Sequence, residues 1–172
     1  MRPRALLAVL AAAPLAAQTP ADSAATPALT PAAVVADTLS TADASARFLA
    51  EVAARPGVER SRSGLLWTVE RRGSGQRPMR SEAVLAEYTG RLADGTVFDA
   101  SPPGAPVRLP VRAVVAGFAE ALQAMRPGET RTVYLPPDLA YGRAGVRGPN
   151  RTWRIPPDAA LVFEITLVRV VQ

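Results

Sequence analysis

The C-terminal end of the chain constrains its fold most strongly, because apolar residues recur there at every second position. Successive side chains of a β-strand point to opposite faces, so residues two apart share a face. On one face, a strand over 161–170 would carry Leu161, Phe163, Ile165 and Leu167. This alternation is typical of a strand that covers a hydrophobic core.

The segments upstream of this strand predict the rest of a sheet and one helix. Three further strands are predicted over 65–71, 84–88 and 130–135. Phe118, Leu122 and Met125 have helical spacing, and Pro127-Gly128 would end that helix. The chain therefore predicts an α+β domain, a twisted antiparallel β-sheet with one short α-helix packed on its concave face.

Two short clusters supply the candidate functional residues. The first is YTGRLADGTVFDAS, residues 88–101, and the second is LAYG, residues 139–142. Together they would place one acid, Asp99, among the aromatic rings of Tyr88, Phe98 and Tyr141. Such a site can hold an apolar group in one pose but lacks a nucleophile for breaking covalent bonds. Rotation about a peptide bond is the reaction that we expect.

Composition excludes several other chemistries. The chain has no His and no Cys, which excludes Ser-His-Asp and Cys-His sites. All 20 basic residues are Arg, so Schiff-base chemistry and a Walker-type lysine are excluded as well. A zinc site would need carboxylates alone, which is unusual. We expect neither a metal nor another cofactor.

The N-terminus predicts export. In residues 1–17, Arg2 and Arg4 precede the apolar run Ala5 to Ala13, and Leu15-Ala16-Ala17 offers a cleavage site. The run is too short to span a bilayer, although an uncleaved interfacial anchor is the alternative. We expect a periplasmic or secreted protein without stable membrane insertion after cleavage. Cleavage would lower the formal charge from +5 to +3 by removing the two arginines, and so small an excess disfavours a nucleic-acid partner.

Three parts follow the predicted signal peptide. Residues 18–39 are rich in Ala, Pro and Thr and would form a disordered tether. Residues 40–57 contain a short helix, capped by Ser40 or Thr41 and ended by Pro56-Gly57. The globular domain spans 58–172. One short helix does not make a convincing coiled coil, so we expect a monomer.

Four motifs in order resemble the FKBP-type peptidylprolyl cis–trans isomerases. They are YTGRLADGTVFDAS, VVAGFAEALQAMRPGE (114–129), PPDLAYG (136–142) and IPPDAALVFEITL (155–167). The resemblance covers nearly all of 58–172. Upstream, FLAEVAARPGV and SGLLWTV are similar to the exported bacterial branch that includes the macrophage infectivity potentiator group.

The resemblance implies an apolar pocket between sheet and helix. Asp99 and Tyr141 would be catalytic together with the backbone N–H of Val115; this N–H and the Tyr141 phenol would bond substrate carbonyls, and Tyr88 would orient Asp99. The substrate-binding residues would be Tyr88, Phe98, Val107, Leu109, Val114, Phe118, Ile155 and Phe163. Phe118 stands where most members have Trp, and Val107 and Leu109 where aromatic residues are usual. These departures predict a wider pocket, weaker binding of macrolide inhibitors and slower turnover.

The implied function is isomerisation of X–Pro bonds in unfolded or partly folded exported proteins. The barrier is roughly 18–20 kcal/mol, because amide resonance must be broken. A dry apolar pocket would favour the less polar twisted amide, without proton transfer. The alternative is a holdase-type chaperone with the same pocket and little activity. The Arg-rich loop 143–154 could select acidic or extended substrates, or its charges could simply be solvated.

Overall fold

A single antiparallel sheet organises the part of the chain that the structure, a computed structural model, describes: residues 40–149 and 152–171. The predicted signal peptide and tether lie outside these residues. Seven of the described strands pair in the order β1-β2-β6-β9-β3-β4, with β5 also joined to β3. Their bounds are β1 (Glu59–Arg60), β2 (Leu66–Arg71), β3 (Ala83–Leu92), β4 (Val97–Ala100), β5 (Val107–Pro110), β6 (Thr130–Leu135) and β9 (Leu161–Val171).

Strand β9 is the centre of this sheet. It pairs along its length with β6 on one side and β3 on the other, and Phe163 lies opposite both Val133 and Gly90. Burial follows the predicted alternation. The buried face carries Leu161, Phe163, Ile165 and Leu167, each 5 % exposed or less. The one-sided burial predicted for this strand is confirmed.

The other three predicted strands are present, and two of them have altered ends. The strand over 130–135 is observed as β6, whereas the segment 84–88 is only the middle of a longer strand, β3. β3 extends through Gly90 because β9 and β4 flank it there. Between β3 and β4 the chain turns at Asp94-Gly95, where Gly95 has a φ of 89° and its N–H donates to Leu92 O at 3.0 Å.

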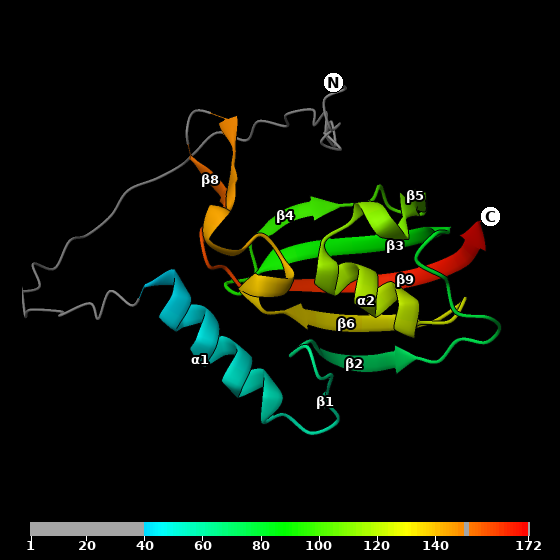
Figure 1. The fold of residues 1–172 in the computed structure, drawn as a ribbon, viewed down its shortest axis with the longest axis horizontal. Coiled ribbons are helices and arrows are strands. Elements are labelled where there is room, and N and C mark those ends of the chain that lie inside the picture. The colour runs from blue at the N-terminus through cyan, green and yellow to red at the C-terminus, as the bar shows by residue number, and fades with distance from the viewer. Residues whose placement is uncertain (1–39, 150–151, 172) are drawn as a thin grey trace, which may run out of the picture. The chain divides into compact units, whose positions relative to one another are not determined.

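Helix α2 (Ala116–Ala124) lies across one face of the sheet (Figure 1). It buries Phe118 and Leu122 in the core that it shares with β6 and β9. Gly117 allows a close approach to β6, because a Cβ atom there would lie 2.8 Å from Leu135 Cγ. The predicted fold class, an antiparallel sheet around one short helix, is confirmed.

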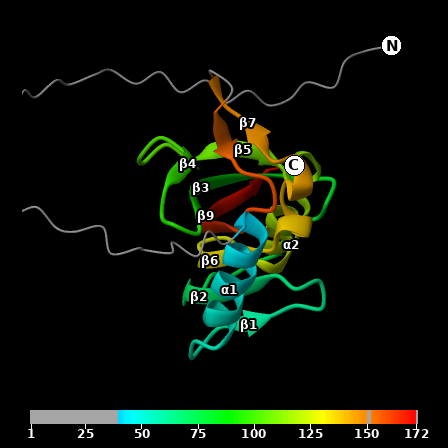
Figure 2. The same ribbon diagram turned by 90° about the vertical axis from the view of Figure 1, so that its left-hand side faces the viewer.

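Helix α1 (Thr41–Ala53) begins after Ser40, whose Oγ accepts the Asp43 N–H at 3.2 Å. Helix α1 belongs to the same compact unit as the sheet. Val52 is fully buried, and the ring centroids of Phe48 and Tyr134 are 6.1 Å apart. A second, two-stranded sheet, β7 (Val146–Arg147) with β8 (Trp153–Ile155), projects beyond the main sheet (Figure 2).

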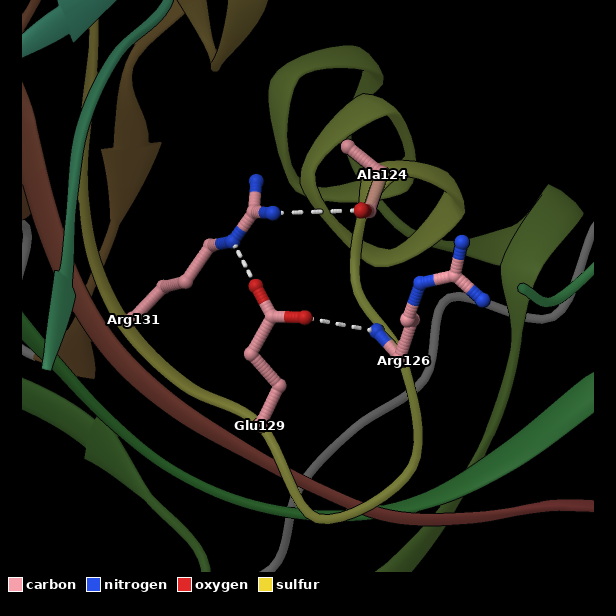
Figure 3. Close-up of polar contacts among 4 residues, drawn as sticks. All are labelled: Ala124, Arg126, Glu129 and Arg131. Carbon is pink, nitrogen blue, oxygen red and sulfur yellow. Dashed lines mark hydrogen bonds and ion pairs between the residues drawn. The ribbon is translucent and has the colours of Figure 1, made fainter. Parts of the chain in front are cut away.

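A buried ion pair holds the connection between the end of α2 and the start of β6 in place. Glu129 and Arg131 pair through Oε1 and Nε (Figure 3). The two residues are only 5 % and 9 % exposed. Arg131 also donates to the carbonyl of Ala124 at 3.1 Å, which satisfies one of the open carbonyls at the helix end. Glu129 Oε2 accepts the Arg126 N–H at 2.9 Å. The network therefore fixes where α2 ends relative to the sheet.

Removing one partner of this pair should destabilise the fold. We expect R131M to lower the free energy of unfolding by about 3–5 kcal/mol, because it leaves the Glu129 carboxylate buried without its cation. The double variant E129Q/R131M should recover much of this loss, since no charge then remains buried. R169M, at an exposed arginine of β9, is the control and should change stability by less than about 0.5 kcal/mol. Urea unfolding measures all three; equal losses in R131M and R169M would contradict the role of the pair.

Candidate active site

Four aromatic rings form a cluster with Phe163 at its centre. The Phe163 centroid lies 4.9 Å from that of Phe118 and 5.5 Å from that of Phe98, both nearly perpendicular to it. Tyr88 is 6.3 Å from Phe163 and 5.7 Å from Phe118. Edge-to-face pairs at these separations are favourable and hold each ring in one orientation. The rings come from β3, β4, α2 and β9, so the tertiary structure unites the aromatic residues predicted from separate motifs.

Gly90, which was not among the predicted site residues, makes room for this cluster. A Cβ atom at Gly90 would lie 2.7 Å from Phe163 Cε1 and 2.8 Å from Phe98 Cζ. Any larger residue would push one of these rings out of place. A glycine inside a strand is itself the signal for such a close approach, and it stands within the motif YTG.

Tyr88 and Asp99 are joined directly, as the resemblance implied. The Tyr88 phenol donates to Asp99 Oδ2 at 2.8 Å, across the β3–β4 pair. Burial, and then the hydrogen bond and negative charge of Asp99, raise the pKa of Tyr88 well above its ordinary value. Burial and the charge of Asp99 also raise the pKa of Tyr141. Both phenols are therefore neutral hydrogen-bond donors at physiological pH.

Arg154 is a second partner of Asp99. Its Nε donates to the Phe98 carbonyl at 2.9 Å, and its Nη2 lies 3.6 Å from Asp99 Oδ1. From the sequence, Arg154 was predicted only to lie in a loop that could meet substrate, because no local pattern shows that β8 reaches back to β4. A second loop arginine, Arg147, stacks on Trp153 with its guanidinium carbon 3.7 Å from the ring centroid. These two side chains make contacts within the protein, so they are not simply solvated charges.

Val115 and Tyr141 provide two further polar groups near the cluster. Val115 is the N-cap of α2, and no acceptor within the described residues takes its N–H. Tyr141 follows the 3-10 turn η2 (Pro137–Leu139) and is 39 % exposed. Its phenol is close enough to Asp99 for that negative charge to help raise the Tyr141 pKa. Both groups can donate to a bound carbonyl, which the resemblance requires.

The remaining predicted residues differ in burial. Val114 and Val107 are half-buried and pack against the core, whereas Leu109 and Ile155 belong to it, at 5 % and 3 % exposure. Their contact with a ligand stays a prediction. Within 40–149 and 152–171, no three Asp or Glu side chains gather as a metal ion would require. The groups that are present can hold an apolar ring and donate hydrogen bonds to carbonyls.

A twisted antiparallel sheet around one helix, with an aromatic cluster and an acid held by a tyrosine, is the architecture of FKBP-type domains. The family description "FKBP-type peptidyl-prolyl cis-trans isomerase" matches residues 75–168. The chain belongs to this family.

Relatives and a solved structure agree with this assignment. The chain is 40 % identical to the peptidyl-prolyl cis-trans isomerase Mip of Coxiella burnetii, over 75 % of the chain and 54 % of that protein. It is 42 % identical to the outer membrane protein MIP of Legionella longbeachae, over 72 % and 51 %. A crystal structure of a peptidyl-prolyl isomerase from Pseudomonas syringae pv. tomato is 36 % identical, with a TM-score of 0.69 over 77 % of the chain and 94 % of that protein.

These matches confirm the resemblance to the macrophage infectivity potentiator group. The chain spans about half the length of the Mip proteins that it matches.

The raised pKa values predict how stability responds to alkaline pH. The native state keeps phenol protons that the unfolded chain releases above the ordinary tyrosine pKa of 10.0. This contribution to stability is complete below pH 10 and is lost as pH rises further. We expect the free energy of unfolding, measured in urea, to fall as the pH is raised above about 10.

The variant Y88F should weaken this decline, because it removes one of the two shifted groups. Y134F is the matched control, since Tyr134 lies on β6 and packs on Phe48 instead. An equal effect of the two variants on the alkaline decline would contradict the assignment.

Proposed function

We propose that this protein is a peptidyl-prolyl cis–trans isomerase that acts on X–Pro bonds of unfolded or partly folded exported proteins. The observation that carries the proposal is the cluster around Phe163, with the Tyr88–Asp99 hydrogen bond at its edge. The membership of the FKBP-type family favours catalysis over the holdase alternative.

The proline ring would bind against the aromatic cluster. Phe118 and Phe163 are 3 % and 5 % exposed, so they offer an apolar floor without a competing polar group. Burial of the pyrrolidine ring against them supplies binding free energy at about 25 cal/mol per Å² of apolar area. We place Phe98, Val107, Leu109, Val114 and Ile155 around this floor, as the resemblance implies.

Catalysis would come from stronger contacts to the twisted amide than to the planar one. Rotation removes the resonance of the X–Pro amide, so its carbonyl becomes less polar and fits an apolar site better. The Val115 N–H and the Tyr141 phenol would hold neighbouring substrate carbonyls in the rotated geometry. Asp99, fixed by Tyr88 and Arg154, would interact with the carbonyl of the rotating bond. No covalent bond breaks and no proton leaves the substrate, so His, Cys and Lys are not needed.

Exchange spectroscopy tests this proposal. NMR should show that a catalytic amount of the protein accelerates cis–trans exchange in short X–Pro peptides. We expect Y141F to reduce the acceleration about tenfold, since one transition-state hydrogen bond of about 1.4 kcal/mol is lost. The combination Y141F/D99A should remove most of it.

Y134F is the control for this experiment, because it deletes a phenol hydroxyl outside the site. It should retain the activity of the unaltered protein. A folded protein that leaves exchange unchanged would refute the isomerase proposal and favour the holdase.

We also propose that the protein is exported, to the periplasm or beyond, and works there as a monomer without a cofactor. The support is the leader-like sequence of residues 1–17, together with the similarity to the outer membrane protein MIP of Legionella longbeachae. None of the described helices is long and apolar enough to cross a membrane.

The export proposal predicts a processed N-terminus. Mass spectrometry of the protein recovered from a bacterial periplasmic fraction should identify Gln18 as the first residue, because Leu15-Ala16-Ala17 is the predicted cleavage site. A variant with Ala17→Arg should accumulate uncleaved. Recovery of the intact chain, Met1 included, from the cytoplasm alone would contradict export.

A further inference from the structure

One hydroxyl of α1 is bonded to the turn between β8 and β9. Ser45 is 3 % exposed, although it lies on a helix outside the sheet. Its Oγ donates to the carbonyl of Asp158 at 2.8 Å and accepts the N–H of Ala160, also at 2.8 Å. A serine hydroxyl has one donor and two acceptor positions, so both bonds form together. Ser45 thus holds the backbone on both sides of residue 159.

Helix α1 is fixed by its own contacts with the core, so Ser45 can support the β8–β9 turn. Val52 is fully buried, and the Phe48 ring packs against Tyr134 of β6. At the other end, the N-cap Ser40 closes the first turn through Asp43. The position of Ser45 is therefore set by the core and not by the turn that it binds.

The turn that Ser45 holds has an unusual backbone conformation. Asp158 has a φ of 57°, and it is the single described residue other than glycine with a positive φ. Aspartate tolerates this left-handed conformation better than most residues, but it still needs support from its surroundings. Hydrogen bonds at both the N–H and the carbonyl of Asp158 provide that support.

The same turn is fastened to the segment that carries Tyr141. The Asp158 N–H donates to the carbonyl of Gly142 at 2.9 Å, one residue after Tyr141. Gly145 is pressed against the backbone before the turn, since a Cβ atom there would lie 2.6 Å from Ile155 O and 2.8 Å from Pro157 N. The Gly145 N–H in turn donates to Tyr141 O at 3.3 Å. The loop after Tyr141 is thus joined to the β8–β9 turn by one hydrogen bond and packs closely, at Gly145, against the backbone that precedes the turn.

We propose that Ser45 is a positioning residue for Tyr141, acting through the Asp158 backbone and the carbonyl of Gly142. Helix α1 is then part of the support of the active site and not an appendage to it. This inference rests on the proposed isomerase function, in which the Tyr141 phenol donates to substrate. A donor displaced by a fraction of an ångström loses much of its effect on the transition state. Both hydrogen bonds of the Ser45 hydroxyl go to the β8–β9 turn and neither goes to the aromatic cluster, so binding of the proline ring should change little.

The test compares S45A with S40A in the full chain. S45A removes both bonds to the β8–β9 turn, whereas S40A removes the cap of the same helix without touching that turn. We expect S45A to lower kcat about tenfold with KM within about twofold of the unaltered protein. S40A should stay within about twofold in both, and S45T, which keeps the hydroxyl, should recover part of the loss. Equal losses in S45A and S40A would show that only helix stability matters and would overturn the proposal.

A double-mutant cycle separates positioning from a general structural role. In the Y141F background, S45A should reduce kcat by less than about twofold, because the donor that Ser45 positions is already absent. A full tenfold loss in that background would overturn the proposal.

Amide chemical shifts provide a readout that does not depend on activity. In ¹H–¹⁵N spectra of folded S45A, the Gly142 and Asp158 amides should shift, and those of β2 should not. If the unaltered protein is inactive, the isomerase proposal fails, and the link from Ser45 is then judged on these shifts alone. Unchanged Gly142 and Asp158 shifts would overturn it in either case.

Discussion

The pairing of β9 with both β6 and β3 is the constraint on which the rest of the structure depends. It places Phe163 opposite Gly90, and the missing side chain of Gly90 lets Phe163 and Phe98 meet edge to face. The buried face of β9 also forms the floor on which α2 packs with Phe118. A shift of one residue in either register would turn Phe163 to the opposite face and remove the centre of the site.

The charged groups complete the site by their arrangement around one carboxylate. One carboxylate oxygen of Asp99 accepts the hydrogen bond of the Tyr88 hydroxyl, and the other faces Arg154. The orientation of Asp99 is therefore set by two different elements. Arg154 is 40 % exposed at its side chain, and a pair so open to solvent contributes little to stability. Arg154 matters for the geometry of the site, because it joins β8 to β4, the strand that carries Asp99.

Two sets of polar contacts outside the aromatic cluster hold the two ends of the site in place. The buried Glu129–Arg131 pair sets the end of α2, while Ser45 and Asp158 brace the loop that follows Tyr141. Each support satisfies backbone groups that burial would otherwise leave without a partner. A site whose chemistry consists of shape and hydrogen bonds depends on such positioning more than one with a strong nucleophile.

The sequence by itself determined the elements whose signal is local. The alternation in β9, the spacing of Phe118 and Leu122 in α2, and the turn at Asp94-Gly95 each follow from side-chain period or backbone preference. The aromatic residues and Asp99 were found through motifs.

Only the tertiary structure decided which distant groups meet: Arg154 at Asp99, Gly90 at the rings, and Ser45 at the Asp158 turn. These contacts join residues up to 115 positions apart. Their formation depends on how packed elements meet in space, which no local pattern of side chains encodes.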